Sequence, residues 1–233
     1  MKLLSIVIPA YNEERFIGTL LDRIRAVDLT PLQFDKEIIV VDDCSRDRTA
    51  EIVASSPGVI LARHAKNCGK GRAVRTGIER AKGDYVMIQD ADLEYEPHDY
   101  APMLQAVLSD SGDVVYGNRY AGGLLAGKHA QQSWAAYLGG RSLSLAALAS
   151  TGQYLADTPT ALKLFPRALL LQLTLETTGF ELDHEITAKV LARKQRIVEV
   201  PIGYFPRSKA EGKKIGLRDW FIGVRTFWKY RRG

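Results

Sequence analysis

The chain has 233 residues, of which 46% are hydrophobic and 25% are charged, and this composition is typical of a folded soluble protein. It excludes a disordered chain, and no apolar stretch approaches the about 20 residues that a membrane-spanning helix needs. The net charge of +5 suits a negatively charged partner, such as nucleic acid, an anionic membrane or a phosphorylated substrate.

The N-terminal segment has one basic residue and a short apolar run that ends at Pro9. This pattern predicts a first strand rather than a signal peptide or a membrane anchor. Cys44 and Cys68 lack the spacing of metal ligands, and nothing indicates a disulfide framework. We therefore expect a reducing compartment, the cytoplasm.

Short apolar runs alternate with helical patterns over residues 1–90. They predict strands at 3–8, 37–41, 59–62 and 85–89, with helices near 13–27, 49–54 and 71–81. Such alternation favours an α/β fold, with a Rossmann-like, mostly parallel sheet covered by helices on both faces. In such sheets ligands bind beyond the carboxyl ends of the strands. Polar clusters at 9–13, 42–45 and 90–92 follow predicted strands, so we expect them to converge on one rim.

Asp42 and Asp43 directly follow the second predicted strand. Ser45 or Asp47 after them can cap the next helix, which leaves Asp43 unexplained. A carboxylate at a strand end can accept a hydrogen bond from a base N–H or a ribose hydroxyl, and this suits nucleoside recognition.

Asn67, Gly69 and Lys70 lie where the third predicted helix begins. Free backbone N–H groups and a cation at a helix start favour an anion. The alternative is a flexible loop with glycines that serve helix packing.

Asp90 and Asp92 follow the fourth predicted strand, with Ala91 between them. Neighbouring carboxylates repel one another unless a divalent cation separates them, and hard oxygen ligands suit Mg²⁺ or Mn²⁺. Two aspartates after a strand are also common as turn formers or helix caps. The pair taken alone leaves both interpretations open.

The order of these motifs resembles the inverting glycosyltransferases of family 2, which have the GT-A fold. Within that family it resembles the branch of the dolichyl-phosphate mannose and glucose synthases and their bacterial undecaprenyl-phosphate relatives. The resemblance rests on Val7-Ile8-Pro9-Ala10-Tyr11-Asn12-Glu13, the segment 40–49, Asn67-x-Gly69-Lys70-Gly71 and Asp90-Ala91-Asp92. It is ordered over residues 4–120 and continues more loosely to residue 216.

The resemblance implies a metal-assisted transfer of a sugar, with inversion, from a nucleoside-diphosphate sugar to a polyprenyl phosphate. It implies a donor pocket lined by Pro9, Tyr11, Glu13, Asp42, Asp43, Asn67, Gly69, Lys70, Asp90 and Ala91. Asp90 and Asp92 would hold Mg²⁺ or Mn²⁺, with Asp92 also counted as catalytic. Glu94, where the family often has glutamine, would be the third ligand. The metal and Lys70 would stabilise charge on the departing diphosphate.

Two basic residues are candidates on the acceptor side. Arg119 ends a predicted strand over 113–120 and resembles the arginine of the family's Gly-Ser-Arg segment; otherwise it is a surface charge. Lys163 lies in 157–165, which resembles a segment that closes the site over the sugar. A lysine among apolar residues on a strand usually faces solvent, but beside a diphosphate it can neutralise charge.

Asp183 and Glu185 begin a helix predicted to end near 192–194. Acidic residues in a first turn favour the helix dipole, so capping alone explains them. With a hydroxyl acceptor, either could serve as the general base, whereas an ionised lipid phosphate needs no strong base. His184 between them is expected at the surface or in a cap.

A basic loop with Arg207, Lys213 and Lys214 follows the last predicted strand at 197–202. A charge run is usually a solvated linker. The resemblance instead implies a segment that folds over donor or acceptor phosphates.

The predicted last helix, 217–233, follows a GT-A domain over 1–216. Leu217, Trp220, Phe221, Val224, Phe227 and Trp228 repeat at helical spacing, with Arg218, Arg225 and Lys229 expected on the other side. Such a face packs on the core or a subunit, or lies on an anionic bilayer. We expect contact with the membrane surface, and so a cytoplasmic protein peripheral to the inner face.

Several alternatives stay open from the sequence. The same chemistry on a soluble hydroxyl acceptor would need Asp183 or Glu185. A noncatalytic nucleic-acid-binding module is remote, because such modules interleave basic and aromatic residues along one groove, and we expect no nucleic-acid partner. The sequence leaves open a UDP or a GDP donor, the sugar and a homo-oligomer.

Overall fold

The computed structural model describes residues 1–120, 134–206 and 217–232. Its strands are β1 (Lys2–Ala10), β2 (Phe34–Asp42), β3 (Val59–Arg63), β4 (Tyr85–Ile88), β5 (Val114–Asn118), β6 (Lys163–Pro166) and β7 (Ile197–Pro201). Its α-helices are α1 (Ile17–Ala26), α2 (Thr49–Ala54), α3 (Lys70–Arg80), α4 (Tyr100–Leu108), α5 (Trp134–Thr151), α6 (Arg167–Gln172), α7 (Leu182–Ala192) and α8 (Leu217–Tyr230). Short 3₁₀ helices span Thr30–Leu32 and Pro97–Asp99.

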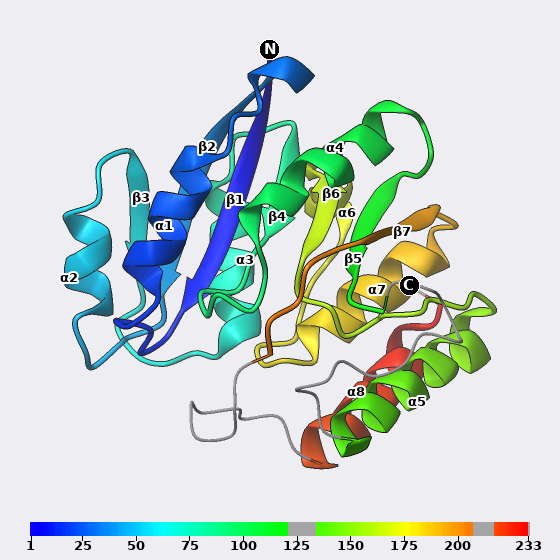
Figure 1. Ribbon diagram of the computed structural model, residues 1–233. Helices are drawn as coiled ribbons and strands as arrows, with labels where there is room; N and C mark the ends of the chain where they lie inside the picture. Colours follow the sequence, from blue (N-terminus) through cyan, green and yellow to red (C-terminus); the bar gives the residue numbers. More distant parts are fainter. Residues whose placement is uncertain (121–133, 207–216, 233) are drawn as a thin grey trace.

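The strands form one twisted sheet in the order β3-β2-β1-β4-β6-β5-β7 (Figure 1). Strands β1 to β4 pair in parallel, as do β5 and β7, while β6 is antiparallel to both of its neighbours. The predicted mostly parallel α/β sheet is therefore confirmed. Because β6 runs backwards, its first residue, Lys163, pairs with Ile88 at the carboxyl end of β4.

Helices cover both faces of the sheet, as predicted. One hydrophobic core joins the sheet to α1 and α4 through residues such as Leu20 and Met103. The other core joins the opposite face to α3, α6 and α7 through residues such as Val74 and Ile186. Strand residues alternate between the two cores, as in a sheet buried on both sides.

The helix expected from residue 13 begins only at Ile17. The backbone N–H groups of Asn12 and Glu13 donate instead to the hydroxyls of Ser45 and Thr49, at 3.0 and 2.8 Å. These bonds keep residues 11–16 in a turn at the rim, where a helix would have carried them away from the second loop.

The C-terminal helix α8 forms a further layer together with α5, on the outer side of α7 (Figure 1). Phe227 and Tyr230 pack with Leu143, Ala147 and Ala188 in a third hydrophobic cluster. The helix is thus joined to the rest of the protein by apolar packing. Among the described residues, no helix is long and apolar enough to cross a bilayer.

The faces of α8 differ from the predicted ones. Phe221 and Trp228, expected beside Phe227 on one apolar face, are exposed, as are Arg218 and Arg225. The helical periodicity predicted one wide apolar face on α8. Helices α5 and α7 cover only part of that face and leave the rest exposed.

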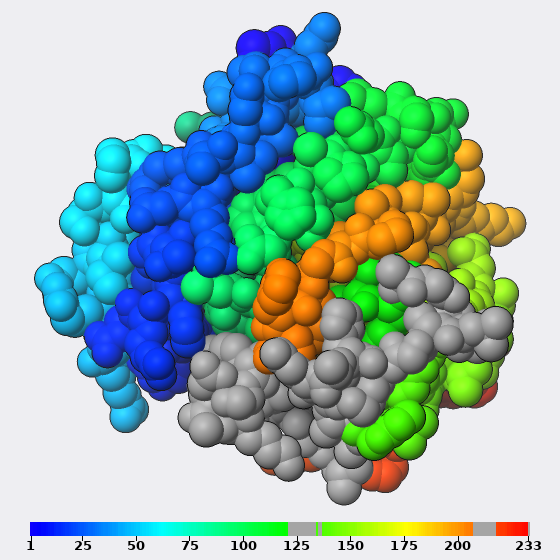
Figure 2. Space-filling model, in the orientation of Figure 1, coloured from blue at the N-terminus to red at the C-terminus, as the bar shows by residue number. Residues whose placement is uncertain are grey.

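The segment after β7 returns toward the segment that contains Asp90, Ala91 and Asp92, which is predicted to bind a metal and is called the metal motif below. Tyr204 forms an antiparallel bridge with Tyr95, and the Phe205 N–H donates to the Glu94 carbonyl at 2.9 Å. In Figure 2 this segment (orange) lies against the green segment that follows β4. The bridge fixes one side of the rim beyond β4.

Candidate active site

The loops after β1 and β2 are bonded together at the rim. Besides the bonds from Asn12 and Glu13, the Asn12 amide oxygen accepts the Arg46 N–H at 2.8 Å, and the Asp43 N–H donates to the Ala10 carbonyl at 2.8 Å. Of the predicted nucleoside-pocket residues, Pro9 is buried, and Tyr11 and Glu13 are half-buried. Pro9 lies at the carboxyl end of β1, and Tyr11 and Glu13 follow it, so the three residues lie at one edge of the rim, as expected.

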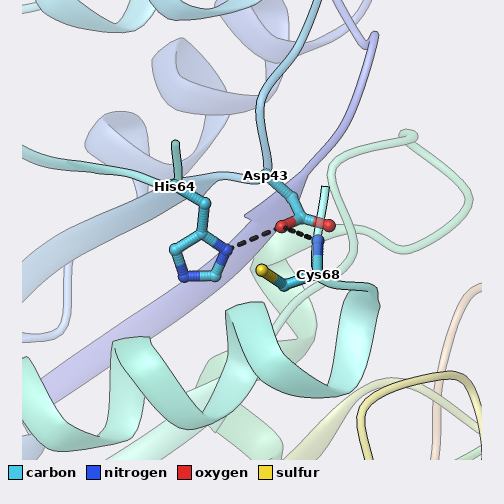
Figure 3. A group of neighbouring side chains, drawn as sticks. All are labelled: Asp43, His64 and Cys68. Carbon is cyan, nitrogen blue, oxygen red and sulfur yellow. Dashed lines mark hydrogen bonds and ion pairs between the residues drawn. The ribbon is translucent and has the colours of Figure 1, made fainter. Parts of the chain in front are cut away.

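Asp43 joins three elements around this edge (Figure 3). Its Oδ1 accepts from His64 Nδ1 at 2.6 Å and from the Cys68 N–H at 2.8 Å, and its Oδ2 accepts the Gly69 N–H at 2.7 Å. A carboxylate offers about four acceptor positions, so one is left for a nucleoside. Asp43 thus organises the loop before α3 as well as facing the predicted donor pocket.

Asp42 and Asn67 differ in their setting. Asp42 is fully buried and accepts from the Ser45 N–H at 3.2 Å and from Arg63 Nε at 3.2 Å. It therefore supports the second loop from beneath. Asn67 is exposed on the loop after β3.

Asp43, His64 and Cys68 also place their ligand atoms within 4.8 Å of one another. His64 Nδ1 faces Asp43, and His64 Nε2 lies 3.0 Å from the Thr76 hydroxyl. A metal ion would displace hydrogen bonds that already engage both the imidazole and the carboxylate. We therefore interpret this group as a scaffold for the loop and not as a metal site.

Gly69 sets the start of α3. Its φ is +90°, and a Cβ there would lie 2.4 Å from the Thr178 carbonyl oxygen. Only glycine fits this backbone and this contact. It places Lys70 as the first residue of α3, with its ammonium directed across the rim to β4.

The metal motif is held from behind by a buried glutamine. Gln89 Nε2 donates to the Asp90 carbonyl at 2.9 Å, and Gln89 Oε1 accepts from the Tyr100 hydroxyl at 3.0 Å. The Asp92 Oδ1 accepts the Glu94 N–H at 3.1 Å. Ala91, between the two aspartates, is buried, so its backbone is fixed by packing.

The residues of this motif fit a divalent cation. Asp90 and Asp92 supply hard oxygen ligands, and the Asp90 carboxylate already attracts a cation, because Lys70 Nζ lies 2.8 Å from its Oδ1. Glu94, predicted as the third ligand, accepts a hydrogen bond from the Tyr204 hydroxyl at 3.0 Å through its Oε2. Its role at the metal stays a prediction.

Lys70 and Lys163 enclose Asp183 in a chain of buried charges. Lys70 Nζ lies 3.4 Å from Asp183 Oδ2, and Lys163 Nζ lies 3.0 Å from Asp183 Oδ1. Lys163 is fully buried and lies 4.9 Å from the Tyr116 ring centroid. The structure therefore directs Lys163 into the site, although its strand pattern left a solvent-facing side chain open.

The pKa values in this chain follow from burial and pairing. Burial opposes ionisation of Asp183, but Lys163 and Lys70 outweigh it and lower the pKa of Asp183 to about 2. Burial also opposes the charge of Lys70, yet Asp183 and Asp90 raise its pKa. For Lys163 burial prevails over Asp183, and its pKa is lowered. Asp183 is thus an ionised acceptor held between two amines.

Glu185 and His184 lie away from these charges, although they neighbour Asp183 in sequence. Glu185 is buried, accepts the N–H groups of Glu176 and Thr177 at 2.9 Å each, and pairs with Lys189 at 2.6 Å. His184, expected at the surface or in a cap, is instead buried against Phe227 of α8. Of the two acids proposed as a base, only Asp183 reaches the rim.

Arg119 has a buried partner. Its Nε and Nη2 donate to the two oxygens of Asp157 at 2.8 and 2.7 Å, and the guanidinium lies 4.9 Å from the Tyr204 ring centroid. This bidentate pair fixes the orientation of Arg119, and contact of Arg119 with an acceptor stays a prediction. Arg207, Lys213 and Lys214 lie outside the described residues.

His64 was not among the residues that the sequence motifs predicted for the site. The imidazole holds Asp43 and touches α3 through Thr76. Its place directly after β3, at the carboxyl end of a parallel strand, was the available signal.

Comparisons with known proteins identify the family of this chain. The sequence profile of glycosyl transferase family 2 matches residues 5–167, more than half of the chain. An undecaprenyl-phosphate 4-deoxy-4-formamido-L-arabinose transferase from Aeromonas hydrophila is 30% identical, over 91% of this chain and 63% of its own length. A UDP-N-acetylglucosamine–dolichyl-phosphate N-acetylglucosaminyltransferase from Methanococcus voltae is 28% identical, over 98% of this chain and 94% of its own. The low-salt glycan biosynthesis hexosyltransferase Agl6 from Haloferax volcanii is 30% identical over 88% of this chain and 48% of its own length. The chain therefore spans less than two thirds of the Haloferax and Aeromonas relatives.

The fold is shared with solved glycosyltransferase structures. Glucosyl-3-phosphoglycerate synthase from Mycobacterium tuberculosis, in complex with Mn²⁺ and UDP-glucose, superposes with a TM-score of 0.70 at 20% identity. The superposition covers 96% of this chain and 76% of that one. These structures have the GT-A fold, as expected for this chain. The chain belongs to glycosyl transferase family 2.

Proposed function

We propose that the protein transfers a sugar, with inversion, from a nucleoside-diphosphate sugar to a polyprenyl phosphate. The observation that carries this proposal is the position of Lys70, on the first turn of α3 between Asp90 and Asp183. A lysine at a helix N-terminus beside the metal motif favours an anion, and we assign this place to the diphosphate. The dolichyl- and undecaprenyl-phosphate transferases among the relatives support the acceptor class.

Asp90 and Asp92 would hold Mg²⁺ or Mn²⁺ against the diphosphate, with Glu94 as a candidate third ligand. When bound, the metal supplies Lewis-acid stabilisation of charge on the leaving diphosphate. Lys70 would exchange its ion pair with Asp90 for a phosphate oxygen and stabilise the same charge. The nucleoside would lie along Pro9, Tyr11, Glu13 and Asp43, at the edge built by the first two loops.

The state of Asp183 favours a phosphate acceptor over a hydroxyl. A general base works best with a pKa near the working pH, and a pKa of about 2 makes Asp183 a weak base. Both of its oxygens also face lysines. An acceptor phosphate is already ionised at neutral pH and attacks without losing a proton. Asp183 would then position the sugar, with Lys163 fixing its orientation.

A polyprenyl acceptor places the reaction at a membrane surface. Because nucleotide sugars are cytoplasmic, we propose that the enzyme works from the cytoplasmic side, as a peripheral protein. The competing proposal is a soluble hydroxyl acceptor with Asp183 as the base.

Calorimetric titration tests the donor half of the proposal. UDP-glucose, GDP-mannose and the free diphosphates are titrated with and without Mn²⁺, into the wild type and an Asp92→Ala variant. We expect metal-dependent binding of one base type, and loss of that dependence in Asp92→Ala. An Asp22→Ala variant, changed at an exposed site on α1, should behave as wild type. Equal binding with and without metal would contradict the mechanism.

Turnover with the bound donor tests the acceptor half. Radioactive sugar should enter an organic extract when undecaprenyl phosphate is supplied. Transfer to a soluble hydroxyl compound, abolished in Asp183→Asn and independent of lipid, would favour the competing proposal.

A further inference from the structure

An apolar surface runs along the outer sides of α5 and α8. Among the described residues of α5, the exposed large apolar side chains are Trp134, Leu138, Leu145 and Leu148, with exposed fractions of 65%, 59%, 55% and 38%. Their spacing of four, seven and three residues places them along one side of the helix. On α8, Phe221 and Trp228 are 65% and 58% exposed and lie two turns apart. We call these six residues the outer stripe.

The two parts of the outer stripe belong to one layer of the molecule. Figure 1 shows α5 and α8 side by side. Trp220 Nε1 of α8 donates to the Ser142 hydroxyl of α5 at 2.8 Å, and Leu143 packs with Phe227 beneath. Since both helices bury their inner sides in this cluster, the opposite side of each helix faces outward. Clustered exposed apolar side chains mark interaction surfaces.

Arginines are among the charged residues that α8 exposes beside the outer stripe. Arg218 and Arg225 are exposed on the same side of α8 as Phe221 and Trp228. No ion pair with another described residue holds either arginine. The sequence of α5 contains no acidic residue, and α8 contains one, Asp219. Aromatic and aliphatic side chains among arginines are typical of helices that lie in the headgroup region of an anionic bilayer.

We propose that the outer stripe, with Arg218 and Arg225, docks the protein on an anionic bilayer. This inference rests on the proposed function, because a polyprenyl phosphate acceptor resides in a membrane. A second copy of the chain fits the surface less well. A twofold interface would bring the arginines of the two copies toward one another without carboxylates between them.

The outer stripe is connected to the reacting groups through α8 and α7. Asp183 and His184 are neighbours in the first turn of α7, and their side chains contact different partners. Asp183 pairs with Lys70 and Lys163, whereas the His184 ring packs against Phe227 of α8, 5.0 Å between centroids. Helices α8 and α7 therefore lie between the proposed bilayer surface and the ion chain.

Vesicle sedimentation tests the docking. The full chain is mixed with vesicles of phosphatidylcholine alone, or of phosphatidylcholine and phosphatidylglycerol. We expect binding to the mixed vesicles only, weakened by salt. Arg218→Gln and Arg225→Gln should each lower the partition constant about fivefold. Leu145→Ser and Phe221→Ser should lower it by about tenfold or more, because each removes a buried apolar group.

Matched controls lie elsewhere on the surface. Leu171→Ser, on α6, and Arg48→Gln, beside α2, change exposed residues of the same types and should leave vesicle binding unchanged. Thermal unfolding and nucleotide titration, measured on every variant, should match the wild type.

Three outcomes would overturn the docking proposal: no sedimentation with mixed vesicles by a folded wild type, equal weakening by the controls, or a dimer that Leu145→Ser dissociates without any vesicle binding. The proposed function fails separately, through absent nucleotide-sugar binding by a protein that still sediments with the vesicles.

Discussion

Replacing Asp183 by asparagine tests the buried ion chain directly. The substitution keeps the shape of the side chain and removes the negative charge that Lys163 and Lys70 share. Lys163 is fully buried, and removing the partner of a buried charge is strongly destabilising. We therefore expect the Asp183→Asn variant to have a lower free energy of unfolding than the wild type at neutral pH.

The size of this loss follows from the pKa of Asp183. Burial raises this pKa, but Lys163 and Lys70 lower it further, from 3.8 to about 2. The difference of about 1.8 between the two pKa values corresponds to about 2 kcal/mol in the free energy of unfolding. Because the folded pKa lies below the unfolded one, the contribution is present above about pH 4 and is lost as the pH falls toward 2.

Urea denaturation at pH 7 measures the effect in a double-mutant cycle of Asp183→Asn and Lys163→Met. We expect Asp183→Asn to cost about 2 to 3 kcal/mol, and the double variant to cost at least about 1 kcal/mol less than the sum of the single ones. Asp22→Asn, at a side chain that is 78% exposed, is the control and should unfold near the wild-type midpoint. Additive costs, or a wild-type midpoint for Asp183→Asn, would refute the ion chain.

Three further predictions concern packing and pH. Burial lowers the pKa of His184 from 6.5 to about 4, so the unfolded chain binds a proton at a higher pH than the folded one does. The free energy of unfolding should therefore fall by about 3 kcal/mol as the pH is lowered from 6.5 to 4. In denaturation at several pH values, His184→Leu should weaken this pH dependence, and an unchanged pH dependence would contradict the assignment. Gly77→Ala should lower stability by about 1 to 3 kcal/mol, because its Cβ would lie 2.2 Å from Val7 Cγ1. Gly139→Ala, where nothing lies within 4 Å, should not lower the melting temperature. Glu185→Gln should cost about 3 kcal/mol by leaving Lys189 buried without its ion pair, yet nucleotide titration should show unchanged affinity; weakened binding would return Glu185 to the site.

The sequence alone was sufficient to predict the alternating elements of the first 90 residues and the rim where they meet. The apolar runs predicted β1 to β4 within one to three residues at each end, and the bounds of α2 were as expected. These elements are readable because local periodicity and strand length decide them. The order of the Asp43, Lys70 and Asp90 motifs along the chain likewise identified the family before any contact was known.

Contacts between distant segments decided the rest. Asp183, and not Glu185, belongs to the site, because Lys70 and Lys163 contact Asp183. Lys70 is 113 residues away from Asp183 in the sequence. Lys163 is directed into the site because β6 runs antiparallel beside β4. The sequence pattern of a strand does not show which part of the protein covers each face of that strand. The exposure of Phe221 and Trp228 was likewise decided by tertiary packing. Helical periodicity gives the width of an apolar stripe, but only the packing of α5 and α7 determines which part of it is left to meet a partner.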